Sequence, residues 1–329
     1  MKKLAKQLLE NKSKTVPILS FPATQLLGVS ITDLISSPEI QATAMQTIAS
    51  RCSVGASLNM MDLSVEAECF GAPIRFSEDD IPTVEKPILS ESKDAEKLPL
   101  PTIGSGRTSI YIEGIRLAKR RITSIPVLCG TIGPYSLAGR LMDMATLMYE
   151  CYDSPDETHA LLEKTTAFII SYILALKSAG ADGVIMAEPV AGLLSPTLAE
   201  EFSTPYVKKI IDAVSDENFL FVYHNCGGTV PSMADQIASL GADIYHFGNA
   251  ISLKDILPKM PSDSIVMGNL DPLLFKEGTA EDINLGLQKI YDECSGFPNF
   301  MLSTGCDVPA TAKWENIDAY FKKINELYA

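Results

Sequence analysis

The stretch Phe219-Leu220-Phe221-Val222-Tyr223-His224-Asn225-Cys226 carries the signal that decides the fold. Its first five residues are apolar without a break, which is typical of a strand buried on both faces, as strands are in parallel sheets. The run then ends in a His-x-Cys pair. Side chains on a strand alternate between its faces, so His224 and Cys226 point the same way, with their Cα atoms roughly 6.6 Å apart. We therefore predict a buried parallel strand whose end presents two ligands to one metal ion.

Comparable apolar runs recur along the chain, and longer stretches with helix signals separate them. Eight runs are predicted as strands, at residues 16–21, 56–62, 125–129, 183–188, 219–223, 243–247, 264–268 and 300–302. A capping box with proline at the first helical position, Ser154-Pro155-Asp156-Glu157, predicts a helix that runs to about Ser178. Eight strands alternating with helices in 329 residues predict a (β/α)8 TIM barrel. A doubly wound open sheet is the alternative, but no glycine-rich phosphate fingerprint follows the first strand to favour it.

One long segment, residues 66–107, interrupts this alternation between the second and third predicted strands. It contains Gly71-Ala72-Pro73, the acidic turn Glu78-Asp79-Asp80 and several further prolines. Long ordered loops usually serve function, so we expect this excursion to rim the barrel mouth. No linker, internal repeat or low-complexity segment divides the chain, which predicts a single domain over residues 1–329.

Composition and charge narrow the class of protein. The chain is 46% hydrophobic and 21% charged, and its net charge of −14 argues against nucleic acid, which selects basic surfaces. Seven irregularly spaced cysteines predict free thiols in a reducing cytoplasm rather than a disulfide framework. Residues 1–10 are too charged for a signal peptide, and no uninterrupted apolar run reaches the roughly 18 residues of a membrane span, so we expect no membrane partner.

A third soft ligand falls at the end of the eighth predicted strand, in Ser303-Thr304-Gly305-Cys306-Asp307. Active sites of this barrel class lie at the carboxyl ends of the strands, where His224, Cys226 and Cys306 would meet. Two thiolates and an imidazole suit zinc, and three protein ligands leave one position open, as in catalytic zinc sites. The same short pattern is also found where cysteine is a small buried apolar residue and histidine only packs.

Other polar residues follow the same strand ends, and each residue type also suits a turn or a cap. From their positions we predict Asp62 and Asn249 as substrate-binding residues and Glu188 as a catalytic residue. The two remaining histidines, His159 and His246, are predicted to lie on a helix face and to pack in the sixth strand.

Three further segments carry a resemblance to a known family: residues 65–71 with 76–79, residues 129–138, and residues 188–196. Together they resemble the uroporphyrinogen decarboxylase superfamily over essentially the whole chain. The branch of zinc-dependent corrinoid methyltransferases, which includes methylcobamide:coenzyme M methyltransferases, carries a His-x-Cys…Cys zinc motif that matches His224, Cys226 and Cys306. The resemblance implies a methyltransferase that moves a methyl group between a corrinoid protein and a small acceptor or donor such as a thiol.

The resemblance to true decarboxylases is weaker at one informative place. Those enzymes hold a polycarboxylate tetrapyrrole with arginines, some of which follow the first strand, whereas this chain has Phe21-Pro22-Ala23-Thr24-Gln25 there. A lyase of the decarboxylase type, with Asp62 or another carboxylate at the barrel mouth steering a pyrrole, stays as the alternative, and a zinc-bearing barrel that binds without turnover is a third possibility. The chain has only three histidines and no Asp-x-His-x-x-Gly cobalamin-binding sequence, so the corrinoid is expected on a partner protein.

Overall fold

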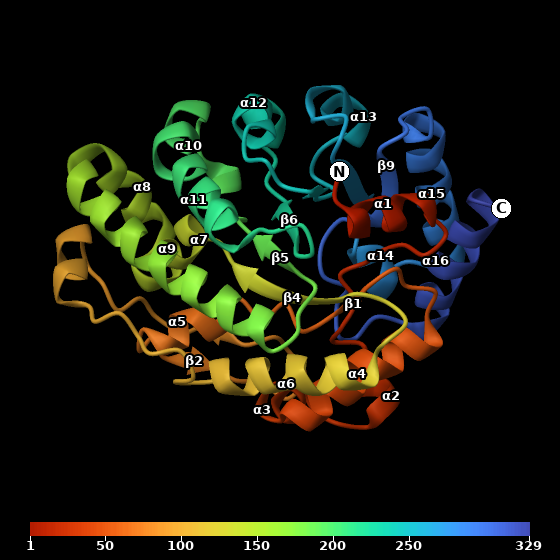
Figure 1. The fold of residues 1–329 in the computed structure, drawn as a ribbon, viewed down its shortest axis with the longest axis horizontal. Coiled ribbons are helices and arrows are strands. Elements are labelled where there is room, and N and C mark those ends of the chain that lie inside the picture. Colours follow the sequence, from red (N-terminus) through yellow and green to blue (C-terminus); the bar gives the residue numbers. More distant parts are fainter.

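The structure, a computed structural model, describes all of residues 1–329. Seven parallel strands form one curled sheet in the order β1-β4-β5-β6-β7-β8-β9, and helices lie around its outside (Figure 1). The strands are β1 (Ser57–Leu58), β4 (Val127–Ile132), β5 (Gly183–Ala187), β6 (Leu220–Asn225), β7 (Ile244–Phe247), β8 (Ile265–Leu270) and β9 (Phe300–Thr304). Each corresponds to a predicted apolar run. The sequence therefore predicted these seven strands and the α/β class correctly.

The helices alternate with the strands, as the barrel prediction required. The α-helices are α1 (Lys3–Glu10), α2 (Ala23–Leu27), α3 (Ile31–Ser36), α4 (Pro38–Arg51), α5 (Val65–Cys69), α6 (Thr108–Arg121), α7 (Pro134–Leu141), α8 (Met144–Asp153), α9 (Pro155–Ser178), α10 (Pro196–Phe202), α11 (Thr204–Val214), α12 (Ala234–Ala238), α13 (Leu253–Ile256), α14 (Leu273–Lys276), α15 (Ala280–Cys294) and α16 (Trp314–Leu327). Four short 3-10 helices are η1 (Ser92–Lys97), η2 (Ala191–Leu193), η3 (Val230–Met233) and η4 (Leu257–Lys259).

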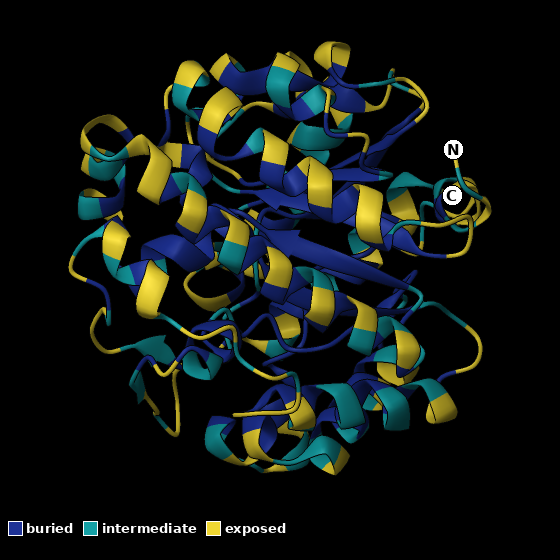
Figure 2. Cartoon of the chain, turned by 60° about the vertical axis from the view of Figure 1, so that its left-hand side comes forward, coloured by how far each residue is buried: buried dark blue, intermediate teal, exposed yellow.

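Every residue of the seven parallel strands is buried, which explains why their sequences show no apolar–polar alternation. Figure 2 shows the strands in the buried interior and exposed residues on the outer faces of helices and on loops. The ladder places Ala187 beside His224 and His224 beside His246. Polar side chains at the ends of neighbouring strands are thereby held at one edge of the sheet.

The first predicted strand, residues 16–21, is not a strand of the sheet. The segment is extended and lies between β9 and the residues before β1, joined by an isolated bridge from Thr15 to Val54. Its hydrogen bonds to β9 involve side chains of that strand: the Ile18 amide donates to Thr304 Oγ1 at 3.1 Å. Pro17 has no N–H to donate, so a regular backbone ladder is interrupted in the middle of the segment.

The long helix α9 begins at Pro155 and is followed by Gly180 at φ +111°, as its start and stop signals predicted. The expected N-terminal capping hydrogen bond is absent: the Ser154 side chain accepts no hydrogen bond from the backbone of the helix. Contrary to expectation, α9 is long and apolar enough to cross a membrane by length and composition alone. Half of that apolar window is buried, and the helix packs against η1, α7, α11 and β4, which is the arrangement of a core helix.

The excursion between β1 and β4 contains α5, η1 and a small hairpin of β2 (Ile74–Arg75) and β3 (Thr83–Val84). Residues 81–84 of this hairpin line a cavity together with His224, Cys226 and Cys306. The predicted excursion is therefore present, and part of it lines the cavity at the carboxyl ends of the strands.

Candidate metal centre

The three predicted ligands come together at the carboxyl ends of β6 and β9. His224 is the second-last residue of β6, and Cys226 and Cys306 follow the ends of the two strands. Their ligand atoms all lie within 4.8 Å of one another, and Cys306 Sγ is 3.6 Å from His224 Nε2. In a tetrahedral zinc site with Zn–S near 2.3 Å and Zn–N near 2.0–2.1 Å, a sulfur–nitrogen edge measures about 3.6 Å. The donor set and this sulfur–nitrogen distance therefore fit zinc.

A close approach of backbone segments places Cys226. A Cβ added at Gly248, just after β7, would lie 2.6 Å from the Cα and the Cβ of Cys226. Only glycine leaves room there, so the residues after β6 can run against those after β7. The Cys226 thiol is thereby brought toward Cys306.

The two thiols are unequal. A hydrogen bond from the Cys306 thiol lowers the pKa of Cys226 to about 7, against the effect of burial. The same hydrogen bond, together with burial, raises the pKa of Cys306. Cys226 is therefore the thiol that more readily forms the thiolate that metal binding and nucleophilic chemistry require.

His224 also has a neighbour on its far side. Its Nδ1 lies 2.6 Å from Nδ1 of His246 and 3.2 Å from the His246 carbonyl oxygen. His246 is completely buried and reaches Ser303 Oγ at 3.1 Å. The sequence predicted only packing for His246. The available signal was the spacing of the two strands, because parallel register sets His246 directly beside His224.

A cavity of about 240 Å³ opens in front of the triad. Its walls are mostly apolar, and only two charged side chains, Arg140 and Asp307, line it. The full lining is Ile18, Met61, Leu63, Ser64, Ile81, Pro82, Thr83, Val84, Arg140, Ala187, Pro189, His224, Cys226, Cys306 and Asp307.

The two charged wall residues were missed by the sequence reasoning, and neither has a partner. Burial lowers the pKa of Arg140, which comes from the end of α7, and no acidic side chain of the chain offsets that effect. Both carboxylate oxygens of Asp307 are buried without a hydrogen-bond partner. Burial, then the neighbouring Cys306, raise the pKa of Asp307 well above its usual range. Buried carboxylate oxygens without a partner are costly, and Arg140 is a half-buried cation without an acidic partner, so both residues point to a ligand in the cavity.

The other predicted site residues surround this cavity without lining it. Asp62 is bound by Arg107 and accepts a hydrogen bond of 2.8 Å from the Tyr111 hydroxyl. Glu188 is fully buried, and its Oε1 accepts from the backbone amides of Tyr135 at 2.8 Å and of Ser136 at 3.1 Å, in the first turn of α7.

The remaining predicted residue, Asn249, is exposed after β7 and lies against Gly305. The structure thus brings together the metal triad, and the roles of Asp62, Glu188 and Asn249 stay predictions.

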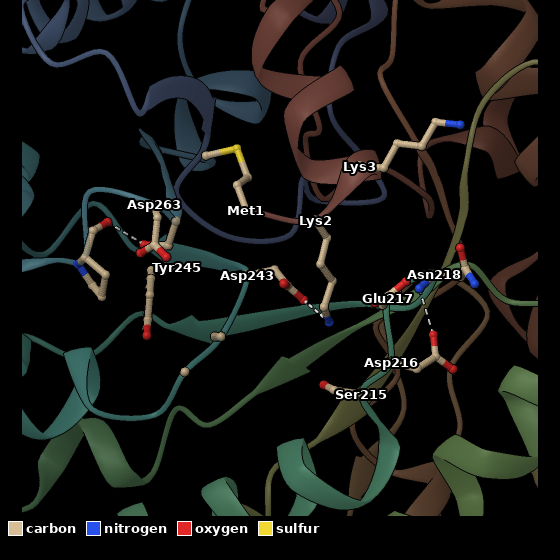
Figure 3. A pocket seen from close by; sticks show the side chains of 14 residues that line it. Met1, Lys2, Lys3, Ser215, Asp216, Glu217, Asn218, Asp243, Tyr245 and Asp263 are labelled. Carbon is tan, nitrogen blue, oxygen red and sulfur yellow. Dashed lines mark hydrogen bonds and ion pairs between the residues drawn. The ribbon is translucent and has the colours of Figure 1, made fainter.

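A larger hollow of about 860 Å³ lies at the opposite, amino-terminal ends of β6, β7 and β8 (Figure 3). Its lining is polar and of mixed charge, and the Lys2 ammonium bridges it by binding Asp243 and the Phe219 carbonyl, each at 2.8 Å. The hollow contains no thiol or imidazole. The reactive side chains are therefore at the smaller cavity.

Comparison with known proteins gives matches along most of the chain. A family profile described as uroporphyrinogen decarboxylase (URO-D) matches residues 18–327. A methylcobamide:CoM methyltransferase MtbA of Methanosarcina acetivorans is 28% identical over 261 residues, which is 78% of this chain and 75% of that protein. A uroporphyrinogen decarboxylase of Geotalea uraniireducens is 26% identical over 295 residues, or 86% and 84% of the two chains.

Two solved structures share the fold. A methyltransferase from Methanosarcina mazei superposes with a TM-score of 0.87 at 22% identity, covering 100% of both chains. A B12-independent methionine synthase from Shewanella sp. W3-18-1 superposes with a TM-score of 0.61 at 13% identity, covering 96% of this chain and 94% of that one. At these identities the likeness concerns the fold.

Proposed function

The chain belongs to the uroporphyrinogen decarboxylase (URO-D) family, as its motifs predicted, and from this premise we propose that it is a zinc-dependent methyltransferase. It would move a methyl group between a corrinoid carried by a partner protein and a small molecule such as a thiol. The observation that carries the proposal is the cluster of His224, Cys226 and Cys306, whose ligand atoms lie within 4.8 Å of one another in the wall of a small cavity. The similarity to a methylcobamide:CoM methyltransferase supports it.

His224, Cys226 and Cys306 would hold the zinc and leave one position facing the cavity. Bound zinc lowers the pKa of a thiol that occupies that position, so the thiol is a nucleophilic thiolate at neutral pH. The chain's own residues then position the substrate. The apolar wall excludes water, and the unpaired Arg140 guanidinium would bind an anionic group at the other end of the substrate.

The same cavity argues against the decarboxylase alternative. Pockets for drug-sized ligands usually measure about 300–1,000 Å³, and this one holds about 240 Å³. It offers one arginine, and the segment 21–25 after the first predicted strand offers none. A tetrapyrrole with many carboxylates needs several such cations.

Five finer points complete the proposal. The extended segment 16–21 would take the place of an eighth strand and close the sheet into a barrel. Residues 1–329 would form a single domain, and the protein would work in the cytoplasm. Glu188 would serve the site by holding the first turn of α7, the helix that carries Arg140. The exposed Asn249 is proposed to contact the substrate or the corrinoid partner at the rim, and the buried Asp62 to serve substrate binding by holding Arg107 and, through it, Ser64 in the cavity wall.

The metal is tested first, by elemental analysis of the purified protein. We expect about one zinc per chain, and we expect His224→Ala, Cys226→Ser and Cys306→Ser each to lose it while the fold is retained. Cys69→Ser is the matched control, because this cysteine is likewise partly buried but lies outside the triad. Stoichiometric zinc in Cys306→Ser would remove that residue from the site.

The reaction is tested with small anionic thiols and methylcobalamin as a surrogate donor. A thiol that binds as thiolate releases a proton, which calorimetry in two buffers of different ionisation enthalpy counts. Zinc-edge absorption should show one sulfur added to those of Cys226 and Cys306. If instead the protein decarboxylates uroporphyrinogen at about 1 per second or faster, a typical enzyme rate, the lyase alternative replaces this proposal.

A further inference from the structure

A continuous line of buried polar contacts leads away from the proposed metal centre. His224 Nδ1 lies 2.6 Å from His246 Nδ1, and the opposite nitrogen of His246, Nε2, lies 3.1 Å from Ser303 Oγ. Ser303 Oγ in turn donates to the carbonyl oxygen of Val16 at 2.8 Å. All four residues are at most 2% exposed. The line joins β6, β7 and β9 to the extended segment that follows α1.

The direction of each hydrogen bond can be assigned by starting from the Val16 carbonyl, where the line of contacts ends. A carbonyl oxygen only accepts, so the single hydroxyl proton of Ser303 is used on Val16. His246 Nε2 must then carry a proton and donate it to Ser303. No carboxylate contacts the buried His246 ring, so the ring is neutral and has one N–H only. Its Nδ1 is therefore an acceptor.

The proton between the two imidazoles consequently belongs to His224 Nδ1. The His246 carbonyl, 3.2 Å from the same nitrogen, is a second acceptor and enforces the same assignment. His224 Nε2 is left with a free lone pair, and this is the atom that faces Cys306 Sγ at 3.6 Å. A metal binds the unprotonated nitrogen of an imidazole, so the tautomer is set before the metal arrives.

We propose that His246 is a positioning residue of the metal centre. With Ser303 and the Val16 carbonyl, it fixes the tautomer and the ring orientation of His224, so that Nε2 is presented to zinc. The inference rests on the proposed function, because it assigns a role toward the proposed zinc. It predicts that zinc affinity depends on a residue that never touches the metal, and partners of this kind typically change metal affinity 10- to 100-fold.

The tautomers are measured directly in the metal-free full-length protein, labelled with 15N-histidine. The chain has only three histidines, and His159, whose Nδ1 lies 2.6 Å from the Tyr206 hydroxyl, is far along the chain and serves as the reference. Long-range 1H–15N correlation should show His224 protonated at Nδ1 and His246 protonated at Nε2. A His224 protonated at Nε2 overturns the proposal.

Zinc affinity is measured by chelator competition. His246→Leu removes both ring nitrogens, and we expect its zinc Kd to rise about 10- to 100-fold. His246→Asn keeps an acceptor near the Nδ1 position and should recover most of the affinity. Ser303→Ala frees the orientation of His246 and should weaken binding less than His246→Leu. Met267→Leu is the matched control, because Met267 is a buried register neighbour of His246 on β8 and lies outside the line of contacts.

The outcomes separate this inference from the proposed function. If His246→Leu is folded by circular dichroism and binds zinc as tightly as the wild type, His246 has no positioning role, whatever reaction the protein catalyses. If His246→Leu does not fold, Ser303→Ala and the wild-type tautomers decide the matter. If the wild type binds no zinc, both the metal centre and the positioning role are wrong. If zinc binds as predicted but no methyl transfer occurs, only the proposed function fails.

Discussion

Replacing Glu188 by glutamine should make the protein more stable at neutral pH. The Glu188 carboxyl is completely buried, and burial raises its pKa from 4.5 to about 8 against the opposing effect of the amide donors of Ser136 and Tyr135. Its second oxygen, Oε2, has no hydrogen-bond partner. In the folded protein at pH 7 the side chain is therefore a neutral acid. Glutamine has the same shape, also accepts from the two amides, and never ionises.

The expected gain follows from linkage. Below pH 4.5 the carboxyl is protonated in both the folded and the unfolded chain, so it adds no pH dependence. As pH rises toward about 8, the Glu188 carboxyl ionises only in the unfolded chain. The free energy of unfolding of the wild type therefore falls by about 1.4 kcal/mol for each pH unit. By pH 7 this loss is on the order of 3 kcal/mol. An unfolding entropy of about 2.1 cal/mol/K per residue converts it to a Tm increase of about 5 °C in Glu188→Gln.

The assay is calorimetric unfolding of the wild type and Glu188→Gln between pH 5 and pH 8. The variant should gain stability over the wild type steadily through this range. Glu217→Gln, a change at an exposed glutamate, is the control and should show no such trend. A variant that is less stable at every pH would show that Glu188 is ionised in the folded protein, and the reasoning would fail. A loss of methyl transfer in the stabilised variant would show that the site needs this residue in its acid form.

Three other substitutions test the surroundings of the cavity. Arg107→Met leaves the completely buried Asp62 side chain without its cation, so unfolding free energy should fall by about 3–5 kcal/mol, measured by denaturant titration; an unchanged midpoint would contradict the pairing. Arg140→Gln should raise KM for an anionic substrate about 10- to 100-fold, as expected for loss of a charge-assisted hydrogen bond, and should leave a neutral analogue unaffected. Gly248→Ala should displace Cys226 and weaken zinc binding in chelator competition, and undiminished affinity would mean that the loop adjusts freely.

The fold could be predicted to the extent that each strand carried its own signal. Strands buried on both faces are continuous apolar runs, and seven of the eight predicted runs form the sheet. The eighth, residues 16–21, is just as apolar, but pairing depends on backbone donors as well as on burial. Pro17 removes one donor, and the segment binds β9 largely through the side chains of Ser303 and Thr304.

The site was predictable where strand ends determined it. His224, Cys226 and Cys306 follow two strands, and the curl of the sheet brings the ends together. Arg140 could not be predicted in the same way, because it lies at the end of a helix and its reach into the cavity depends on how α7 docks. Glu188 shows the converse, since it stands at a strand end but its carboxylate turns away to the first turn of α7.

The charge of the cavity separates the two kinds of chemistry known in this family. A zinc ion with the thiolates of Cys226 and Cys306 and a neutral His224 has no net charge. Burial, then the neighbouring Cys306, raise the pKa of Asp307 well above its usual range, which favours the neutral form of this carboxyl. Arg140 is the one cation on the wall, and no acidic side chain pairs with it, in a protein whose net charge is −14. One unpaired cation matches one anionic group, whereas a polycarboxylate would bring several unpaired charges into an apolar cavity. The cavity is therefore suited to a small substrate with a single anionic end and a reactive group at the thiolates.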